Sequence, residues 1–325
     1  MMETPLRIRF IMDCAPEGLE LLTPGGSLRW GNCVFDINPP EGGETDFCVV
    51  LANATPRDRF RVAPCNTLFI AGEPLEKKLY PPAFYAQFGH VIDTHDRSGH
   101  PHLIQSAPGL NWHVGLDQGA NRYLYGLDRL RTIEYPQKEN RISVVCSDAA
   151  HTPGQRKRLA LLEYLKRRLG KRLVHFGRGF HPVNDKMEAI LPYRYHLVLE
   201  NSVSRHYWTE KLADAYLGWA FPVYAGCTNI EDYFPRTAFL PIDVDQPEQA
   251  ERTLRQLLDA PWDESHVPAL REARDLVLDR YNPFAWSAHW ASRLYVDAES
   301  RLVTLRSHKA FRPFPRGLLF RLRSR

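Results

Sequence analysis

The 325-residue sequence lacks any long hydrophobic run and any large excess of one charge. No apolar stretch approaches the ~20 residues that span a bilayer. The N-terminal MMETPLRIRFIMD has neither the basic segment nor the apolar stretch of a signal peptide. Lys and Arg number 42 against 38 Asp and Glu, and this is too even a balance for a protein that coats nucleic acid. We expect a cytoplasmic protein, either free or peripheral on the inner face of the membrane, with no nucleic-acid partner.

Disulfide and zinc patterns are also missing. The six cysteines form no CxxC pair and have no zinc-ligand spacing. Most lie in or beside apolar runs, where a thiol behaves as a small hydrophobic group, so we expect them to be reduced and buried. They are Cys14, Cys33, Cys48, Cys65, Cys146 and Cys227.

Three short patterns resemble ligand sites but lack the necessary spacing. The segment Gly177-Arg178-Gly179 does not continue as a GxGxxG phosphate loop. The histidines His95, His100 and His102 fit no tight metal site and are more typical of a polar loop. Asp243-Val244-Asp245 has the form of a manganese-binding D-x-D, but that tripeptide is common. The sequence therefore predicts no metal and no cofactor.

Length and composition predict two ordinary globular domains. Hydrophobic residues make up 44% of the chain and charged residues 25%, as in typical globular proteins. The chain exceeds the ~250–300 residues at which one core usually divides into two. The polar segment 126–141 is typical of a linker. We therefore place the domains at 1–130 and 131–300, followed by a tail at 301–325.

Both halves predict an α/β fold. In the first half, short apolar runs are each followed by Gly, Pro, Asn or Asp, and they predict strands at 6–12, 33–37, 47–51, 67–71 and 90–92. In the second half, strands at 142–147, 173–176, 195–199, 222–225 and 239–244 alternate with helices at 153–169, 209–219, 247–258 and 267–279. This alternation is typical of βαβ units with a parallel sheet, whose ligands bind outside the carboxyl ends of the strands.

The tail has a composition unlike the rest of the chain. From His308 onward, HKAFRPFPRGLLFRLRSR contains six Lys or Arg and no acid, with Phe and Leu interleaved. Such a segment suits an anionic membrane surface, where each basic residue contributes roughly 1 kcal/mol. The alternatives are a solvated tail and a tail folded back on the body.

The segment LENSVSRHYWTEKLADAYLGWAFPVYAG, residues 199–226, concentrates charge at one strand-to-helix turn. Glu200 and Asn201 end a strand, and Thr209 is a good N-cap for the helix that follows. Glu210 in the first turn complements the helix dipole, so a capped helix explains part of the pattern. Lys211 beside the same helix N-terminus would also suit a phosphate.

This segment resembles the α-1,3-fucosyltransferases of glycosyltransferase family 10. The resemblance is carried by Glu200-Asn201-Ser202, Tyr207, Thr209-Glu210-Lys211 and Pro222-Val223-Tyr224-Ala225-Gly226. Upstream, Arg158 occupies the place of a family arginine that reaches the donor pyrophosphate, although Arg156 competes for that role. In the first half, FIAGEP and HVIDTHD are similar to the family's acceptor-side segments. They depart from the pattern at Pro74 and at Asp93-Thr94-His95.

The resemblance implies a GT-B fold, in which two Rossmann-like domains face each other across a cleft. Domain 1–130 would bind the acceptor and domain 131–300 would bind GDP-L-fucose. The reaction would be an inverting transfer of L-fucose to a hydroxyl of a glycan acceptor, such as the 3-OH of N-acetylglucosamine. A bacterial surface glycan, in protein glycosylation or lipopolysaccharide biosynthesis, is the expected acceptor class.

The resemblance also implies roles for particular residues. Glu73 would be the catalytic base, and His95 or Asp96 would contact the acceptor or replace Glu73. The donor-binding residues would be Arg158, Asn201, Tyr207, Glu210 and Lys211. Positive charge and a helix N-terminus would stabilise the departing GDP in place of a metal ion.

Three alternatives stay open at this point. A transferase on the same scaffold could use another nucleotide sugar, because sugar choice depends on a few pocket contacts. A basic nucleic-acid-binding protein would need one continuous basic face with stacking aromatic residues. An inactive, lectin-like relative is disfavoured by the presence of Arg158, Glu210 and Lys211.

Overall fold

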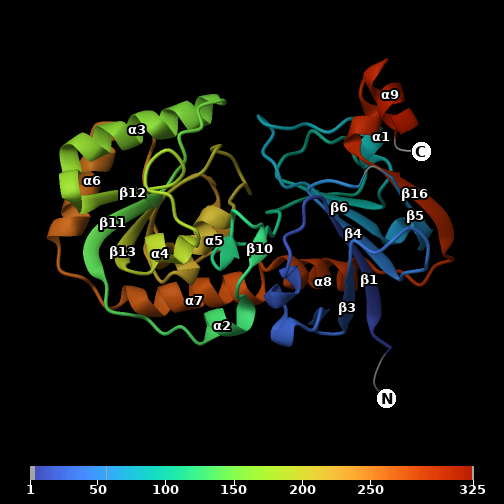
Figure 1. The fold of residues 1–325 in the computed structure, drawn as a ribbon, viewed down its shortest axis with the longest axis horizontal. Helices are drawn as coiled ribbons and strands as arrows, with labels where there is room; N and C mark the ends of the chain where they lie inside the picture. The colour runs from blue at the N-terminus through green and yellow to red at the C-terminus, as the bar shows by residue number, and fades with distance from the viewer. Residues whose placement is uncertain (1–3, 56, 324–325) are drawn as a thin grey trace. The chain divides into compact units, whose positions relative to one another are not determined.

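The computed structural model describes residues 4–55 and 57–323, and the chain divides into two compact units (Figure 1). Unit 1 comprises Met1–Gly109 together with Pro283–Arg325, and unit 2 is Leu110–Asn282. These boundaries differ from the predicted ones, which followed residues 130 and 300. The difference arises because the chain returns to unit 1 after residue 282 and completes its core there.

Unit 1 is built on a seven-stranded sheet in the order β2-β3-β1-β4-β6-β7-β8. All neighbouring strands run parallel except β2 and β3. The strands are β1 (Leu6–Met12), β2 (Arg29–Trp30), β3 (Cys33–Ile37), β4 (Phe47–Leu51), β6 (Thr67–Ile70), β7 (His90–Asp93) and β8 (Leu103–Gln105). Every strand predicted in this half is therefore present, to within one residue at each end.

Apolar side chains cover both faces of this sheet. On one face, Phe284 of helix α8 (Pro283–Leu294) packs against Phe10 and Phe35, with ring centroids 5.3 and 5.1 Å away. The other face buries a cluster that includes Phe69 and the short helix α1 (Pro82–Tyr85). Helix α8 supplies part of the core, which explains why unit 1 cannot end at residue 109.

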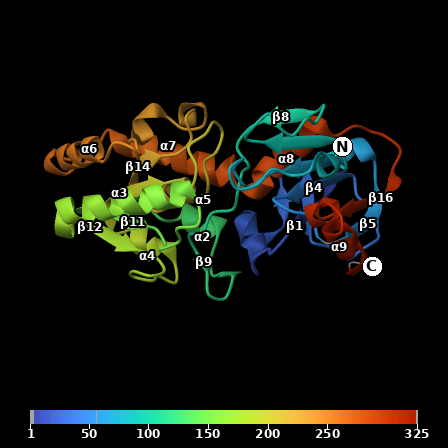
Figure 2. The same cartoon turned by 90° about the horizontal axis from the view of Figure 1, so that it is seen from above.

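The predicted tail is folded onto unit 1 over part of its length. Strand β16 (Arg301–Arg306) runs antiparallel beside β5 (Arg57–Val62), as Figure 2 shows. Leu305 is buried in the core cluster. A final helix, α9 (Arg316–Arg323), follows and leaves apolar side chains exposed, among them Leu318 at 49%. The folded-back alternative is thus correct for β16, which was not predicted as a strand.

Unit 2 contains a five-stranded parallel sheet in the order β12-β11-β13-β14-β15. Its strands are β11 (Glu139–Val145), β12 (Leu173–Phe176), β13 (Tyr193–Leu199), β14 (Phe221–Ala225) and β15 (Leu240–Pro241). Its helices are α2 (Leu127–Arg131), α3 (Pro153–Leu169), α4 (Lys186–Ile190), α5 (Glu210–Leu217), α6 (Pro247–Asp259) and α7 (His266–Asp279). A small hairpin, β9 (Leu116–Asp117) with β10 (Arg122–Tyr123), precedes them.

The strand order of unit 2 reverses at β11. The chain moves from β11 to β12 on one side and then to β13 on the other. Such a reversal leaves a crevice at the carboxyl ends of the two strands that flank it, where ligands of doubly wound folds bind. The predicted α/β class with Rossmann-like parallel sheets is confirmed in both units. The arrangement of the units across a cleft stays a prediction.

Segment 126–141 is not the linker that its polarity predicted. It contains α2 and the start of β11, and both lie within unit 2. Ile133 accepts a hydrogen bond from Trp219 Nε1 at 2.8 Å. Lys138 Nζ donates to the carbonyls of Leu191, Tyr193 and Gly218 at 2.6, 3.1 and 2.9 Å. The polar residue types of this segment do not reveal these hydrogen bonds.

The six cysteines are free, as predicted. Four of them are buried, whereas Cys14 and Cys65 are exposed, which corrects the expectation that all were buried. Across residues 4–55 and 57–323, no helix is both long and apolar enough to cross a membrane.

Candidate functional site

The candidate site lies at the carboxyl ends of β13 and β14 in unit 2. Glu200 follows β13, and its backbone N–H donates to Ala225 O of β14 at 2.9 Å. A Cβ at Gly226 would lie 2.4 Å from Glu200 Cγ, so only glycine leaves room for this side chain. Glu200 is thereby pressed into the interior, where it is 4% exposed.

Glu200 fixes the start of α5. Its carboxylate accepts hydrogen bonds from Thr209 N at 2.8 Å and Thr209 Oγ1 at 2.7 Å. Lys211 Nζ lies 3.4 Å from the same carboxylate and donates to Thr209 Oγ1 at 3.0 Å. The predicted N-cap role of Thr209 is confirmed, because its hydroxyl accepts from Lys211 N. A buried acid thus locks the first turn of the helix in place.

Glu210 and Lys211 form an ion pair at 2.9 Å, with both side chains less than one-fifth exposed. Burial alone would raise the pKa of Glu210, but Lys211, His113 and Lys186 outweigh it and hold that pKa well below its usual range. Burial would lower the pKa of Lys211, yet Glu210 and Glu200 raise it. Both groups are therefore charged at neutral pH.

At Glu200, unlike at Glu210, the effect of burial on the pKa outweighs the opposing contacts. Burial raises the pKa of the Glu200 carboxyl group, and Glu210 adds to that effect while Lys211 and the Thr209 hydrogen bonds oppose it. The ammonium of Lys211 therefore lies between two carboxylates of unequal acidity.

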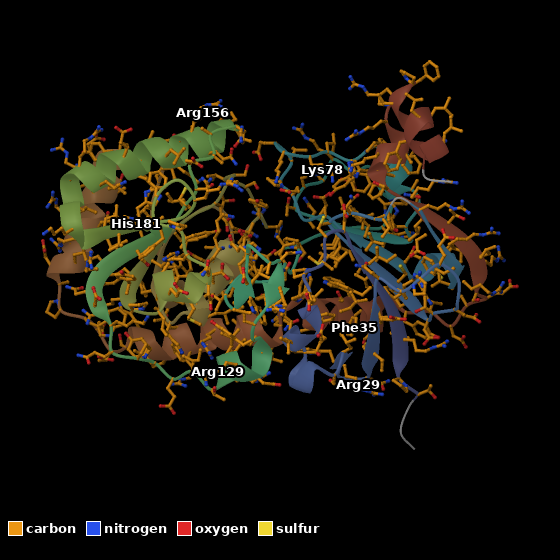
Figure 3. The ribbon with its side chains drawn as sticks, in the orientation of Figure 1. Arg29, Phe35, Lys78, Arg129, Arg156 and His181 are labelled. Carbon is orange, nitrogen blue, oxygen red and sulfur yellow. The ribbon has the colours of Figure 1, made fainter. Side chains whose placement is uncertain are left out.

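The structure distinguishes Arg158 from its competitor Arg156 on α3. Arg158 is 5% exposed and donates through Nη1 to Leu199 O at 3.2 Å, at the end of β13. Its Nε is buried and has no hydrogen-bond partner among the described residues. Arg156 is exposed, lies on the outer side of the helix (Figure 3) and donates to Ala150 O and His151 O. Arg158 is therefore the arginine that faces the site.

The N-terminus of α3 also reaches this edge of the sheet. Thr152 and Gln155 form a capping box that fixes the first turn. A Cβ at Gly154 would lie 2.1 Å from Asn201 O, so glycine permits the helix to touch the strand end. Two helix N-termini, those of α3 and α5, consequently flank Asn201.

Cys146, which follows β11, lies near both cations of the site. Burial raises the pKa of its thiol, and Arg158 and Lys211 both lower it. The two cations therefore lie near the carboxyl end of β11 as well as that of β13. This is the crevice at which the strand order reverses.

Tyr207 lies in the loop between β13 and α5 and is 2% exposed. It contributes to raising the pKa of Lys211, so its phenolic oxygen lies near that ammonium. The preceding residue, His206, has a φ of 62°, an uncommon value for a residue with a side chain. Asn229 Oδ1 accepts from His206 N at 2.7 Å and holds the loop in this conformation.

Three charged or titratable residues that the sequence did not single out join the site. Asp214 of α5 is 1% exposed and accepts from Lys186 Nζ at 2.7 Å. It also accepts from the backbone N–H groups of His113 and Val114 at 2.7 and 3.0 Å. Burial and the nearby Lys186 lower the pKa of His113, so its ring is neutral at pH 7.

These three residues come from separate parts of the chain, and that is why sequence reasoning missed them. Lys186 starts α4, Asp214 lies in α5, and His113 precedes the β9 hairpin. An acid in the middle of an otherwise apolar helix face, LADAYL, was the one signal available for Asp214.

The predicted acceptor-side residues lie in unit 1. Glu73 follows β6, is partly exposed and pairs with Lys77 at 2.6 Å. Asp96 is exposed. His95 Nδ1 accepts from Arg97 N at 3.1 Å, and its Nε2 faces the buried Asp93 at 3.4 Å.

These contacts make His95 a weaker candidate for the base than the carboxylates of Glu73 and Asp96. With Nδ1 of His95 occupied as an acceptor, its Nε2 carries the proton toward Asp93, so His95 has no lone pair free to act as a base. Nothing in the structure assigns a chemical role to Glu73 or Asp96.

The other metal-like patterns form no binding cluster. Asp245 pairs with Lys157 at 2.7 Å on the surface, and Asp243 Oδ1 accepts from Asp245 N. In the part of the chain that the structure describes, no three His, Cys, Asp or Glu side chains are grouped to hold a metal ion.

The donor-side residues that the sequence predicted thus gather within one unit. Arg158, Glu210 and Lys211 bring charge to the reversal point of the sheet, where Asn201 and Tyr207 also lie. Buried cations beside helix N-termini can stabilise a phosphate group. The residues predicted for the acceptor lie at the edge of the other sheet.

Comparison with known proteins assigns a family to the segment that carries this site. Residues 135–263 match the model of "Glycosyltransferase family 10 (fucosyltransferase) C-term". The predicted resemblance to that family is confirmed for these residues. The match contains all five donor-side residues and excludes Glu73, His95 and Asp96.

Curated relatives share the same region. A 3-galactosyl-N-acetylglucosaminide 4-alpha-L-fucosyltransferase of Homo sapiens is 32% identical over 143 residues, covering 42% of this chain and 38% of its own. A 4-galactosyl-N-acetylglucosaminide 3-alpha-L-fucosyltransferase of Homo sapiens is 32% identical over 143 residues, covering 42% of this chain and 37% of its own. The matched region thus spans less than two-fifths of the length of these relatives.

Solved structures resemble the chain over most of its length, at low identity. A crystal structure of an alpha1,3-fucosyltransferase with GDP-fucose aligns with a TM-score of 0.49 and 16% identity, covering 91% of this chain and 92% of that one. The same kind of enzyme with GDP aligns with a TM-score of 0.47 and 13% identity, covering 92% and 95%.

Proposed function

Because residues 135–263 carry the C-terminal domain of glycosyltransferase family 10, we propose that the protein is a fucosyltransferase. It transfers L-fucose from GDP-L-fucose to a hydroxyl group of a glycan acceptor, with inversion at the anomeric carbon. The observation that carries this proposal is the buried charged cluster at the reversal point of the second sheet, which lies inside the matched domain.

The surroundings of Arg158 favour a diphosphate as the ligand. Its buried Nε has no hydrogen-bond partner among the described residues, and leaving a charged donor unsatisfied is costly. An oxygen of the GDP diphosphate would satisfy it. Lys211 and the N-terminus of α5 supply further positive potential for the same group.

The same groups would assist departure of GDP. Negative charge develops on the diphosphate as the bond to fucose breaks, and preorganised cations stabilise that charge. Arg158 and Lys211 fulfil this task in the proposal without a metal ion. Glu210 stays ionised because its pKa is held low by Lys211, His113 and Lys186 against the effect of burial. We assign it, with Asn201 and Tyr207, to the ribose and fucose.

A general base must accept the proton of the acceptor hydroxyl as fucose is transferred. Glu73 is the residue to which we assign this role. It is partly exposed and follows a strand of the first sheet, where acceptors would bind in a fold of this class. Its partner Lys77 would have to release it, or share it, during the reaction.

For the acceptor, we propose N-acetylglucosamine or a similar sugar on a bacterial surface glycan. The relatives' names specify an N-acetylglucosaminide, with transfer to the 4-position in one case and the 3-position in the other. Both hydroxyls are therefore to be tested, and we place the 3-OH first.

Contact with an anionic membrane surface is a second part of the proposal. Helix α9 leaves Leu318, Leu319 and Leu322 about half exposed beside basic residues. Apolar insertion together with positive charge is the pattern of an interfacial helix. Vesicle co-sedimentation with and without phosphatidylglycerol would test it, and equal sedimentation with both would contradict it.

The proposed activity can be tested by incubating the full chain with GDP-fucose and β-linked N-acetylglucosamine acceptors, with EDTA present. The expected product is an α-fucoside, identified by mass spectrometry and by the anomeric coupling in NMR. Retained β-configuration would contradict inversion, and dependence on Mg²⁺ or Mn²⁺ would contradict metal-independent transfer. Transfer from GDP-mannose or UDP-glucose in preference to GDP-fucose would favour the alternative donor.

A further inference from the structure

The carboxyl edge of the first sheet holds a second charged region, in unit 1. Asp13 follows β1, Asn53 follows β4 and Glu73 follows β6, and these three strands include two neighbouring pairs. In an open α/β sheet this is the edge where ligands bind. The family model does not cover these residues, since its match begins at residue 135.

The backbone at this edge is strained. Cys14 and Ala52, which follow β1 and β4, have φ values of 57° and 63°. Residues with side chains seldom adopt this conformation, and where they do the strain is often part of a binding site. Ala52 O accepts from the Tyr80 hydroxyl at 2.6 Å, which fixes the turn that presents Asn53.

A hydrogen-bonded relay ties the C-terminal segment to this edge. Asn53 donates through Nδ2 to Asp13 Oδ2 at 2.9 Å, so its Oδ1 is free to accept from His308 Nδ1 at 2.8 Å. Burial, followed by the nearby Lys78, lowers the pKa of His308 to about 4, so the ring is neutral at pH 7. The segment that follows β16 is consequently a built part of the edge.

Three cations surround this relay. Lys78 is half-buried over the ring of Tyr80, with Nζ 4.3 Å from the ring centroid. Lys309 and Arg312 are exposed and lie close enough to depress the pKa of His308 further. We call Lys78, Lys309 and Arg312 the cationic cluster.

The three cations of the cluster form no close ion pair among the described residues, although the carboxylates of Glu73 and Asp13 are near Lys78. Within residues 4–55 and 57–323, no carboxylate lies within 4.0 Å of any of its three side chains. The nearest influences on Lys78 are burial, which lowers its pKa, and the opposing charges of Glu73 and Asp13. Glu73 is already paired with Lys77, and Asp13 is held by Asn53. Like charges gathered in a partly desolvated place are stabilised when an anion binds.

We propose that the cationic cluster binds an anionic group, a phosphate or a carboxylate, carried by the glycan acceptor. This inference rests on the proposed fucosyltransferase function, because it makes the acceptor an acidic sugar. The cluster lies beside Glu73, the assigned base, so an anionic group held there would fix the acceptor while its hydroxyl approaches that carboxylate.

A contact with membrane phosphates would use the same chemistry, but the position of the cluster favours a sugar. Its half-buried member Lys78 lies near Glu73. Exposed apolar side chains lie on α9 and also at Leu79, next to Lys78, and at Phe314, close after Arg312. A half-buried ammonium is more accessible to a small anionic group than to a bilayer surface.

The test uses the full chain saturated with GDP, so that phosphate cannot occupy the donor site. Calorimetry compares N-acetylglucosamine 6-phosphate with N-acetylglucosamine. We expect the phosphorylated sugar to bind roughly tenfold or more tightly, since hydrogen bonds to charged groups contribute about 1.5–3 kcal/mol each. The advantage should shrink as salt is raised.

Substitutions in the cationic cluster test which of its residues bind the anionic group. Lys309→Gln with Arg312→Gln should weaken binding of the phosphorylated sugar by roughly three- to fivefold, because exposed pairs contribute up to about 1 kcal/mol. Lys78→Met should weaken it more, by roughly tenfold or more, because Lys78 is half-buried. The matched control is Arg29→Gln, an exposed arginine on β2 that Figure 3 shows in a different part of unit 1 from Lys78. It should leave both affinities unchanged.

Several outcomes would overturn the proposal without touching the fucosyltransferase assignment. Equal affinity for both sugars, or full binding by the Lys78→Met and double variants, would show that the cluster does not hold the anion. Loss of vesicle binding in those variants, with no effect on the sugar, would make it a lipid contact. If GDP-fucose itself fails to bind, the proposed function is wrong, while preferential binding of the phosphorylated sugar would still mark an anion site.

Discussion

The carboxyl edges of the two parallel sheets organise charge in opposite ways. In unit 2, Lys211 lies between Glu200 and Glu210, and each of the three side chains is at most 18% exposed. In unit 1, Glu73 is paired only with Lys77 at a partly exposed site, and Lys78 has no carboxylate within 4.0 Å among the described residues. The carboxyl edge of unit 2 is ordered by internal ion pairs, and the carboxyl edge of unit 1 is left open.

This difference matches the proposed division of labour. A site whose charges are already ordered loses little further freedom on binding, which suits an invariant ligand such as a nucleotide sugar. An open edge whose cations form no close ion pair can serve different acceptors. The family match, which is confined to residues 135–263, covers the ordered edge and stops short of the open one.

Removing Lys211 should have the largest effect on the ordered edge. Lys211→Met leaves the buried Glu200 and Glu210 carboxylates without their cation, and loss of one partner of a buried pair costs about 3–5 kcal/mol. We expect the free energy of unfolding to fall by that amount in urea titrations. The control, Lys157→Met, breaks an exposed pair with Asp245 and should cost at most about 1 kcal/mol. Equal losses in both variants would contradict the comparison.

The pH dependence of stability tests the contribution of Glu210 to the ordered edge. The pKa of Glu210 is lowered in the folded protein, so its ionised form contributes stability that is complete above the unfolded value of about 4.3 and is lost as pH falls through the folded pKa. Glu210→Gln should therefore cost about 1.5–3 kcal/mol at pH 7, the value of a hydrogen bond to a charged group. The gap from wild type should be constant above pH 4.3 and shrink below it. A gap that widens in acid would show that the pKa is not depressed.

Gly226→Ala tests how tightly the ordered edge is packed. The added methyl group would lie 2.4 Å from Glu200 Cγ, and such overpacking costs about 1–3 kcal/mol. We expect lower thermal stability together with weaker binding of GDP, because Glu200 braces Thr209 and Lys211. The control is Gly42→Ala, in a loop of unit 1 where no atom lies within 4 Å of the added Cβ. Its positive φ of 96° adds local strain but should leave GDP binding unchanged.

The smallest effect on stability is expected at the open edge. Glu73→Gln removes an exposed ion pair with Lys77 that contributes at most about 0.5 kcal/mol as an i,i+4 contact. GDP affinity should be unaltered, whereas transfer to the acceptor should fall by roughly 10²–10⁴-fold if Glu73 is the base. Undiminished transfer would remove Glu73 from the mechanism. Asp96→Asn, in the same unit, is then the next variant to measure.

Sequence alone predicted local elements well. The strands at 6–12, 33–37 and 47–51 and the helix at 153–169 have the predicted bounds. Each of these has a strong local cause, which is either an apolar run ended by a turn residue or a capping box at Thr152. The motif also placed Asn201, Tyr207, Glu210 and Lys211 at one strand-to-helix turn, where the structure has them. Their role as donor contacts stays a prediction.

The sequence alone did not predict contacts between residues that are far apart in the chain. β16 pairs with β5, about 240 residues earlier, and no local pattern encodes that partner. The same holds for Lys186 with Asp214, and for the choice between Arg158 and Arg156, which depends on which side of α3 faces β13. The polar residues of segment 126–141 suggested solvent, yet Lys138 donates to three backbone carbonyls in the interior.

The central claim, that the ordered edge of unit 2 is a preformed site for GDP-fucose, is tested most directly by calorimetric titration of wild type and Arg158→Gln with GDP-fucose, GDP and UDP-glucose in EDTA. The account predicts micromolar binding of GDP and GDP-fucose by the wild type, much weaker binding of UDP-glucose, and roughly tenfold or greater loss in Arg158→Gln, whose lost guanidinium would no longer meet the diphosphate. Absence of binding to either guanine nucleotide, or unchanged affinity in the variant, would contradict it.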